Sequence, residues 1–157
     1  MHIWVDADAC PVAVRDIIAK AATRLKIRAV FLANHKVPLL PSSFVSMKIV
    51  DQGFDVADRE ILTEAAEFDL VVTQDVLLAA ELVAKGIIAI NPRGTLYTKD
   101  SMHGHLIRRN QAEAARDLGM QGRGAEPFGP KHVQTFASTF DRELTRLHQR
   151  YQRVNVL

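Results

Sequence analysis

The sequence predicts an α/β protein in which a central, mainly parallel five-stranded sheet is flanked by helices in a three-layer sandwich. Short apolar runs of strand length alternate with longer segments whose apolar residues recur at helical spacing, which is typical of a parallel sheet covered by helices. The 157 residues are enough for one domain with a substantial core. Hydrophobic residues make up 48% and charged residues 24%, the balance of an ordinary globular protein.

Five apolar runs are predicted to form the strands, because they are short and are followed by turn-forming residues. They cover residues 2–5, 28–33, 46–50, 70–73 and 87–90. Helices are predicted between some of these strands, over residues 11–25, 59–67 and 76–85. Pro11 fits the first turn of its helix, Asp58 is placed to cap the second, and Gly86 ends the third.

The last third of the chain is predicted to add two helices, over residues 101–118 and 133–151. The first is expected to turn four residues inward: Leu106, Ile107, Ala114 and Ala115. The second carries an apolar stripe of Phe136, Phe140, Leu144 and Leu147. Residues 1–157 are therefore predicted to form a single domain, with residues 119–157 as a flexible loop plus a C-terminal helix. This last part could serve as a lid or as a dimerisation arm, so a homodimer stays open.

Charge is unevenly distributed, although the net charge is only +2. Residues 1–86 hold 9 Lys and Arg against 12 Asp and Glu, whereas residues 87–157 hold 11 against 6. An acidic half followed by a basic half is typical of a metal site beside a phosphate-binding surface. A solvated basic helix would give the same distribution.

No membrane association is expected, since no apolar stretch approaches the roughly 20 residues needed to cross a bilayer and no signal peptide opens the chain. Cys10 is the single cysteine and cannot form an internal disulfide, which favours a reducing compartment. We therefore expect a cytoplasmic protein.

Two carboxylates directly follow the first predicted strand. Side chains at positions i and i+2 leave a strand on the same side, so Asp6 and Asp8 are expected to project together from its carboxyl end. Open α/β sheets place their ligand crevices at this end of the strands. Two carboxylates so close repel each other unless a cation or a shared proton relieves them, which suggests a divalent metal ion.

Further carboxylates follow other predicted strands, at Asp51, Asp55, Asp58 and Asp75. Because the carboxyl ends of parallel strands share one edge of the sheet, these side chains are expected to meet there. Carboxylates without a cluster of Cys or His favour a hard ion, so Mg²⁺ or Mn²⁺ is the expected cofactor. Such a site can activate water and stabilise the leaving oxygen of a phosphodiester. Taken singly, Asp58 could be only a helix cap and Asp75 only a turn residue.

Two segments of the chain resemble known families. The segment DVADREILTEAAEFDLVVTQD, residues 55–75, resembles the core signature of PIN-domain nucleases: an aspartate at a helix start, an alanine-rich helix, a strand and Thr-x-Asp. The opening IWVDADACPV, residues 3–12, is closer to the YaiI/YqxD family of uncharacterised bacterial proteins, which is assigned a PIN-like fold. GFDVAD, TQD, NPRG and residues 127–142 also resemble that family, so the likeness spans nearly the whole chain. It implies a PIN-like three-layer sandwich.

The resemblance also implies roles for individual residues. Asp6 is similar to the first-strand carboxylate of PIN nucleases, Asp58 to the helix-start carboxylate and Asp75 to the Thr-x-Asp carboxylate. These three are the implied catalytic residues and metal ligands, with Asp8 as a further ligand from the narrower family motif. Asp55 could supplement the site or shape the turn. PIN nucleases usually add an acidic residue after the next strand, whereas NPRG stands there in this chain.

RNA is the expected partner, and basic residues are expected to contact its phosphates. Arg93 stands in a loop after a predicted strand and would face the crevice. Lys36 follows the second strand, and Thr73 precedes Asp75 in the Thr-x-Asp motif; with Arg93 they are the predicted substrate-binding residues. A longer phosphate track could add Lys99, Arg108, Arg109, Arg123 and Lys131.

Three other interpretations stay open. Cys10 and Arg15 approach the spacing of the phosphate-binding loop of tyrosine phosphatases, with one residue fewer between them. The neighbouring aspartates oppose the lowered thiol pKa that such a loop needs, so packing in the core is the simpler role for Cys10. Asp6-x-Asp8 resembles the motif of haloacid-dehalogenase phosphatases, in which the first aspartate is a nucleophile. A non-catalytic nucleic-acid-binding protein could retain the PIN-like fold.

Overall fold

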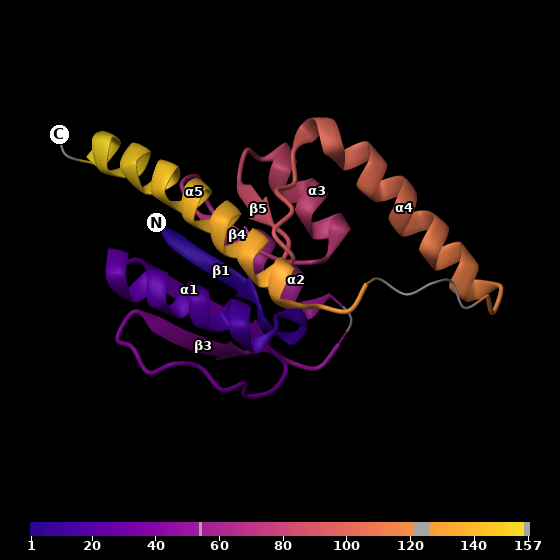
Figure 1. The fold of residues 1–157 in the computed structure, drawn as a ribbon, viewed down its shortest axis with the longest axis horizontal. Coiled ribbons are helices and arrows are strands. Elements are labelled where there is room, and N and C mark those ends of the chain that lie inside the picture. The colour runs from indigo at the N-terminus through magenta and orange to yellow at the C-terminus, as the bar shows by residue number, and fades with distance from the viewer. Residues whose placement is uncertain (54, 121–125, 156–157) are drawn as a thin grey trace.

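The computed structural model describes residues 1–53, 55–120 and 126–155 (Figure 1). Within these residues, one sheet is formed by β1 (His2–Asp6), β2 (Arg28–Ala33), β3 (Val45–Ile49), β4 (Leu70–Val72) and β5 (Ile88–Ile90). The order across the sheet is β3-β2-β1-β4-β5, and every neighbouring pair is parallel. The strands predicted from the apolar runs are all present, with ends that differ by one residue at most.

Helices cover both faces of the sheet. In the described residues they are the 3₁₀ turn η1 (Ala7–Ala9) and the helices α1 (Val12–Leu25), α2 (Val56–Glu64), α3 (Val76–Ala84), α4 (Lys99–Asp117) and α5 (Pro130–Asn155). Side chains of α1 and α5 share one core with the sheet. Side chains of α2, α3 and the start of α4 form a second core on the opposite face. The predicted three-layer α/β sandwich is therefore confirmed.

Alternation along β1 allows one strand to serve both cores. Ile3 and Val5 are fully buried under α1 and α5, whereas Trp4 belongs to the opposite core. The three residues of β4 are all buried, because both faces of a central parallel strand are covered. The short apolar runs of the sequence are therefore strands of a sheet that is buried on two sides.

The order of the strands opens a crevice beside β1. The chain adds β2 and β3 on one side of β1 and then β4 and β5 on the other. As a result α1, which follows β1, lies on one face of the sheet and α3, which follows β4, lies on the opposite face. Where neighbouring strands send their connections to opposite faces, a crevice forms at their carboxyl ends. Asp6 ends β1, and Asp75 follows β4.

The start of α2 corrects the predicted role of Asp58. The helix begins at Val56, three residues earlier than predicted, and its cap residue is Asp55. Asp58 lies inside the first turn, so the prediction that it caps the helix is wrong. An acidic residue is still favourable there, because it faces the positive end of the helix dipole. Asp55 has a left-handed backbone, with φ of 64°, and its side chain makes no capping hydrogen bond.

The second half of α4 is less buried than its sequence pattern predicts. Leu106 packs against the core, but Ile107 is 42% exposed and Ala114 is exposed. The helix contacts α3 near its start and then extends away from the rest of the described chain (Figure 1). The predicted inward orientation is therefore wrong for Ile107 and Ala114, while Ala115 is half-buried.

The C-terminal helix α5 belongs to the core and is not an excursion from it. Its buried side chains pack against the sheet and α1; they are Phe136, Phe140, Leu144 and Leu147. A lid formed by α5 would expose all of this apolar surface to water, so that expectation is wrong. The predicted flexible connection over residues 119–130 falls partly on residues 121–125, which lie outside the described residues. Across the described ranges, no helix combines the length and the apolar character needed to cross a membrane.

Candidate metal centre

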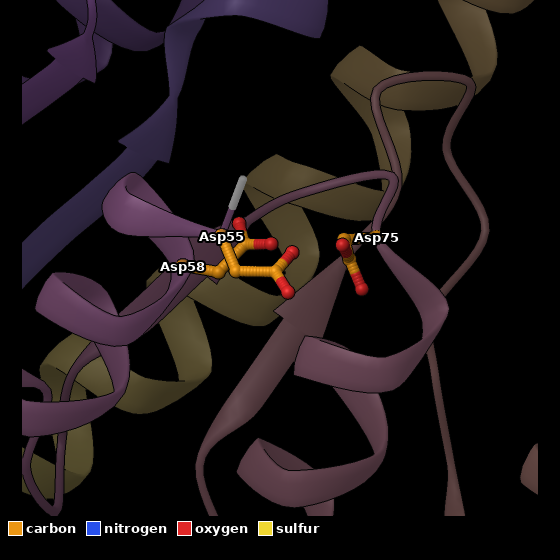
Figure 2. A group of neighbouring side chains, drawn as sticks. All are labelled: Asp55, Asp58 and Asp75. Atoms are coloured by element: carbon orange, nitrogen blue, oxygen red, sulfur yellow. The ribbon is translucent and has the colours of Figure 1, made fainter. Parts of the chain in front are cut away.

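Three aspartates meet at the carboxyl end of the sheet (Figure 2). Asp55 and Asp58 come from the start of α2, and Asp75 comes from the start of α3. Each offers one carboxylate oxygen, and these three oxygens lie within 4.8 Å of one another. Oxygens on opposite sides of an octahedral Mg²⁺ lie about 4.2 Å apart, so small side-chain rotations would bring all three onto one ion.

Asp75 is held in place by the connection between β4 and α3. Its Oδ1 accepts a hydrogen bond from the amide of Leu78 (2.9 Å) and so caps α3. Its own amide donates to Oγ1 of Thr73 (3.0 Å), which is fully buried. Two independent hydrogen bonds therefore fix the backbone and the side chain of Asp75 at the edge of the crevice.

Asp6 adds a fourth carboxylate from the neighbouring strand. Burial first, and then the charges of Asp8 and Asp75, raise the pKa of Asp6 to about 6. Hydrogen bonds from the amide of Asp8 and from the hydroxyl of Thr73 act in the opposite direction. Asp6 is outside the group of three mutually close oxygens, but its charge contributes to the raised pKa of Asp58.

The like charges act together on Asp58. Burial, a hydrogen bond with Asp75 and the charges of the surrounding aspartates raise the pKa of Asp58 to about 8. The carboxyl is therefore largely protonated at neutral pH unless a positive charge replaces the proton. A divalent cation would supply that charge, and an all-oxygen donor set suits Mg²⁺ or Mn²⁺. The residues present fit such an ion.

The three aspartates line a small cavity of about 140 Å³, which we call the aspartate cavity. Two further charged residues line it, Arg59 from α2 and Glu81 from α3. Glu81 is not among the predicted site residues, because a further acidic residue is considered only after the last strand, where this chain reads NPRG. A usable signal was present: Leu77, Leu78 and Glu81 share one side of α3 at spacings of three and four residues.

Asp8 is placed differently from its prediction. Because β1 ends at Asp6 and Asp8 lies in the 3₁₀ turn, the prediction that both side chains project together from a strand is wrong. The exposed carboxylate of Asp8 lies 3.5 Å from Nδ1 of His35. Its backbone amide donates to the carboxylate of Asp6, so the turn helps to position Asp6.

Asp51 and Lys36 are exposed and lie in the connections on either side of β3, the edge strand. Lys36 lies between β2 and β3, and Asp51 follows β3. Three strand spacings, about 14 Å, separate β3 from β4. Among the described residues, neither belongs to the group of carboxylates around Asp75.

Thr73 and Cys10 are both buried beside the crevice. The hydroxyl of Thr73 hydrogen-bonds to Asp6 and accepts a hydrogen bond from the amide of Asp75, so it positions both of these residues. Burial raises the pKa of the Cys10 thiol to about 12, although Arg15 opposes this effect and Asp6 adds to it. A buried, protonated thiol does not support a cysteine nucleophile of the phosphatase type.

Arg93 lies in the turn after β5, beside the start of α5. Its amide donates to Oδ1 of Asn91 (2.8 Å), and its guanidinium lies 3.2 Å from Nε2 of His132. The guanidinium carbon is 5.8 Å from the ring centroid of Phe128. Arg93 therefore has a defined position, in a depression separate from the aspartate cavity.

The fold and its carboxylates define an α/β protein with an all-parallel sheet and an acidic crevice at the point where the strand order reverses. The family model described as "Uncharacterized BCR, YaiI/YqxD family" matches residues 4–146. The chain therefore belongs to the YaiI/YqxD family, and the resemblance of its motifs to that family is confirmed.

Curated relatives match almost the whole chain. The UPF0178 protein of Marinobacter nauticus is 47% identical over 146 residues, which is 93% of this chain and 97% of the relative. The UPF0178 protein of Hydrogenovibrio crunogenus is 45% identical over 146 residues, again 93% of this chain and 97% of the relative. That of Shewanella loihica is 43% identical over 150 residues, 96% of this chain and 100% of the relative. No solved structure matches the chain significantly.

Proposed function

We propose that this protein is a metal-dependent nuclease that hydrolyses phosphodiester bonds of RNA with Mg²⁺ or Mn²⁺. The observation that carries the proposal is the meeting of Asp55, Asp58 and Asp75 beside Asp6 at one end of the sheet. Carboxylates that raise one another's pKa are stabilised by a divalent ion, and oxygen ligands suit Mg²⁺ and Mn²⁺. The likeness of residues 55–75 to the PIN-domain signature supports a PIN-like nuclease.

A bound divalent ion would lower the pKa of a water molecule and stabilise negative charge on the phosphate. Asp55, Asp58 and Asp75 would hold that ion, while Asp6 orients the attacking water from the end of β1. Arg59 lines the same cavity and would neutralise charge on the phosphate oxygens. The hydroxyl of Thr73 would keep Asp6 in position during the reaction.

The test is cleavage of a mixed panel of labelled RNAs by the purified protein in Mn²⁺ and in Mg²⁺. Asp58→Asn and Asp75→Asn should each reduce the rate by about 100-fold or more, because each removes a ligand of the ion. Asp51→Asn removes the same charge at an exposed position outside this group of carboxylates and should retain the full rate. If the double variant Asp58→Asn/Asp75→Asn cleaved RNA at the rate of the wild type, the proposal would be contradicted.

A non-catalytic nucleic-acid-binding protein with the same fold is the second candidate. One observation favours it: the turn after β5 reads NPRG, where PIN nucleases usually add an acidic residue. RNA binding without cleavage that depends on a divalent ion would support this candidate. Turnover of small phosphomonoesters, with covalent labelling at Asp6, would instead identify a phosphatase.

A further inference from the structure

A second depression lies on the other side of the connection between β4 and α3. Its volume is about 380 Å³, within the range of about 300–1,000 Å³ that is typical of ligand sites. Polar side chains from three parts of the chain line it: Gln74, Asn91, Arg93, His105, Arg108 and Arg109. We call this depression the basic groove.

A short wall separates the basic groove from the aspartate cavity. Gln74 and Val76 line the groove, whereas Asp75 and Leu77 line the cavity. Successive residues of one connection therefore face alternate sides. A chain-like ligand held over the cavity would need to cross only this wall to reach the groove.

The charge of the basic groove is positive. Three guanidinium groups line it, from Arg93, Arg108 and Arg109, and its described lining residues include no carboxylate. Arg109 also pairs with Glu113 on the next turn of α4, at 2.8 Å, which orients its guanidinium. Guanidinium groups present several N–H donors in one plane and bind phosphate oxygens in pairs.

His105 adds a neutral hydrogen-bond donor to these charges. Burial and the charge of Arg108 lower the pKa of His105, so its ring is neutral at pH 7. The guanidinium of Arg108 can donate to Nδ1 of His105 (3.2 Å), which places the proton of the neutral ring on Nε2. The Nε2–H group can then donate to an anionic oxygen without adding a charge.

The aromatic side chain that lines the groove is not available for stacking. Tyr97 is 5% exposed, and its hydroxyl accepts a hydrogen bond from Nδ2 of Asn91 (3.1 Å). Its ring lies edge-on to His105, with 5.1 Å between the ring centroids. Stacking of bases requires an open ring face. The described lining of the groove therefore suits phosphates and not bases.

We propose that the basic groove binds backbone phosphates of a single-stranded polynucleotide whose scissile phosphate lies over the aspartate cavity. This inference rests on the proposed function, because it assigns the kind of strand that enters the same site. A flexible single strand can bend over the wall between the two depressions. A duplex is stiff over about 150 base pairs, as measured for DNA, and does not bend over a wall that is one connection wide.

The test measures binding without cleavage, as the fluorescence anisotropy of a labelled single-stranded RNA in EDTA. Arg108→Gln/Arg109→Gln removes two charges from the groove. Lys20→Gln/Arg116→Gln is the matched control, because it removes two charges from exposed helix positions outside the groove. We expect the groove variant to bind at least about 10-fold more weakly. Its slope of log K against log salt should fall by about 0.7 for each phosphate that the variant no longer neutralises.

Equal reductions of affinity in the two double variants would overturn the inference, because affinity would then follow net charge alone. Duplex RNA, or a nucleoside monophosphate, that binds as tightly as the single strand would also overturn it. Two RNAs of different sequence should bind alike. Because EDTA removes divalent ions, the outcome of the binding test is independent of the nuclease assay. If the protein binds single-stranded RNA selectively but cleaves no RNA, the result would support RNA binding in the basic groove and contradict the proposed nuclease activity.

Discussion

Asp6 and Asp58 hold protons more tightly in the folded chain than ordinary carboxyls do in water. Burial is the largest cause at both sites, and it raises the pKa of Asp6 to about 6 and that of Asp58 to about 8. The unfolded chain has ordinary values near 4, so the folded state binds more protons between about pH 4 and pH 8. Without a divalent ion, the free energy of unfolding should therefore fall as the pH rises through this window.

Replacing Asp58 by asparagine should stabilise the protein in EDTA at about pH 9. The amide keeps a hydrogen bond to Asp75 and removes a charge, so we expect Tm to rise by roughly 2–4 °C. This corresponds to about 1 kcal/mol once solvent screening of a half-exposed group is allowed for. At about pH 5 the difference should disappear, because Asp58 is already protonated. Thermal unfolding followed by circular dichroism measures the effect.

The matched control for Asp58→Asn is Asp51→Asn, which should leave Tm nearly unchanged at both pH values because Asp51 is exposed and is not among the charges that act on Asp58. A lower Tm for Asp58→Asn at about pH 9 would show that the carboxylate stabilises the fold. That result would contradict the repulsion inferred among the aspartates.

Among the elements, α5 is positioned by its contact with the turn after β5. Gly94 has φ of 98°, and a Cβ at this residue would lie 2.6 Å from the carbonyl carbon of Thr135 and 2.7 Å from the amide nitrogen of Phe136. The turn can approach the helix only because this position has no side chain. The same contact brings Arg93 beside His132.

Gly94→Ala should destabilise the protein far more than Gly86→Ala. Both glycines have positive φ, but a Cβ at Gly86 meets nothing within 4 Å. Gly86→Ala should therefore cost only the backbone strain, about 1 kcal/mol, whereas Gly94→Ala should cost about 1–3 kcal/mol more because α5 must move. Urea unfolding at equilibrium measures both free energies. Equal costs would show that the turn does not constrain α5.

The strands and helices were largely predictable from the sequence, since each depends on local spacing. Residues 28–33 and 70–73 are short apolar runs between turns, and the structure has strands at both places. Residues 106–115 have equally regular apolar spacing, yet half of α4 is exposed. Local spacing shows which side of a helix is apolar, but the surrounding fold determines whether anything covers that side.

Across the whole molecule, the strand order determines which connections meet. The connections after β1 and β4 are neighbours because these strands pair, although about 65 residues of chain separate them. Asp51 directly follows the edge strand β3, whereas Asp55 and Asp58 lie further along the same connection, where α2 begins, and among the described residues these two are the ones that reach Asp75. The expectation that every aspartate after a strand would converge therefore holds for only part of the connection between β3 and α2.

A divalent ion that binds this crevice should stabilise the folded protein as a whole. Binding to the folded state alone adds about 2.7 kcal/mol at a concentration 100 times Kd, which raises Tm by roughly 5–10 °C. We expect Mn²⁺ to produce this shift in the wild type and in Asp51→Asn, but not in Asp58→Asn/Asp75→Asn. Differential scanning calorimetry over a series of Mn²⁺ concentrations is the measurement. A shift of the same size in the double variant would locate the ion elsewhere.

Local patterns in the chain were sufficient for the parallel α/β sandwich and for Asp58 and Asp75 near strand ends. Spacing and turn chemistry act over a few residues, and each segment carries them on its own. The composition of the acidic crevice required the packed molecule. Asp55 lies beside Asp58 and Asp75 because α2 begins at Val56, earlier than its apolar spacing predicts. Glu81 lines the cavity because it lies on the side of α3 that faces α2. These placements follow from helix orientation over the sheet, which depends on contacts between distant segments.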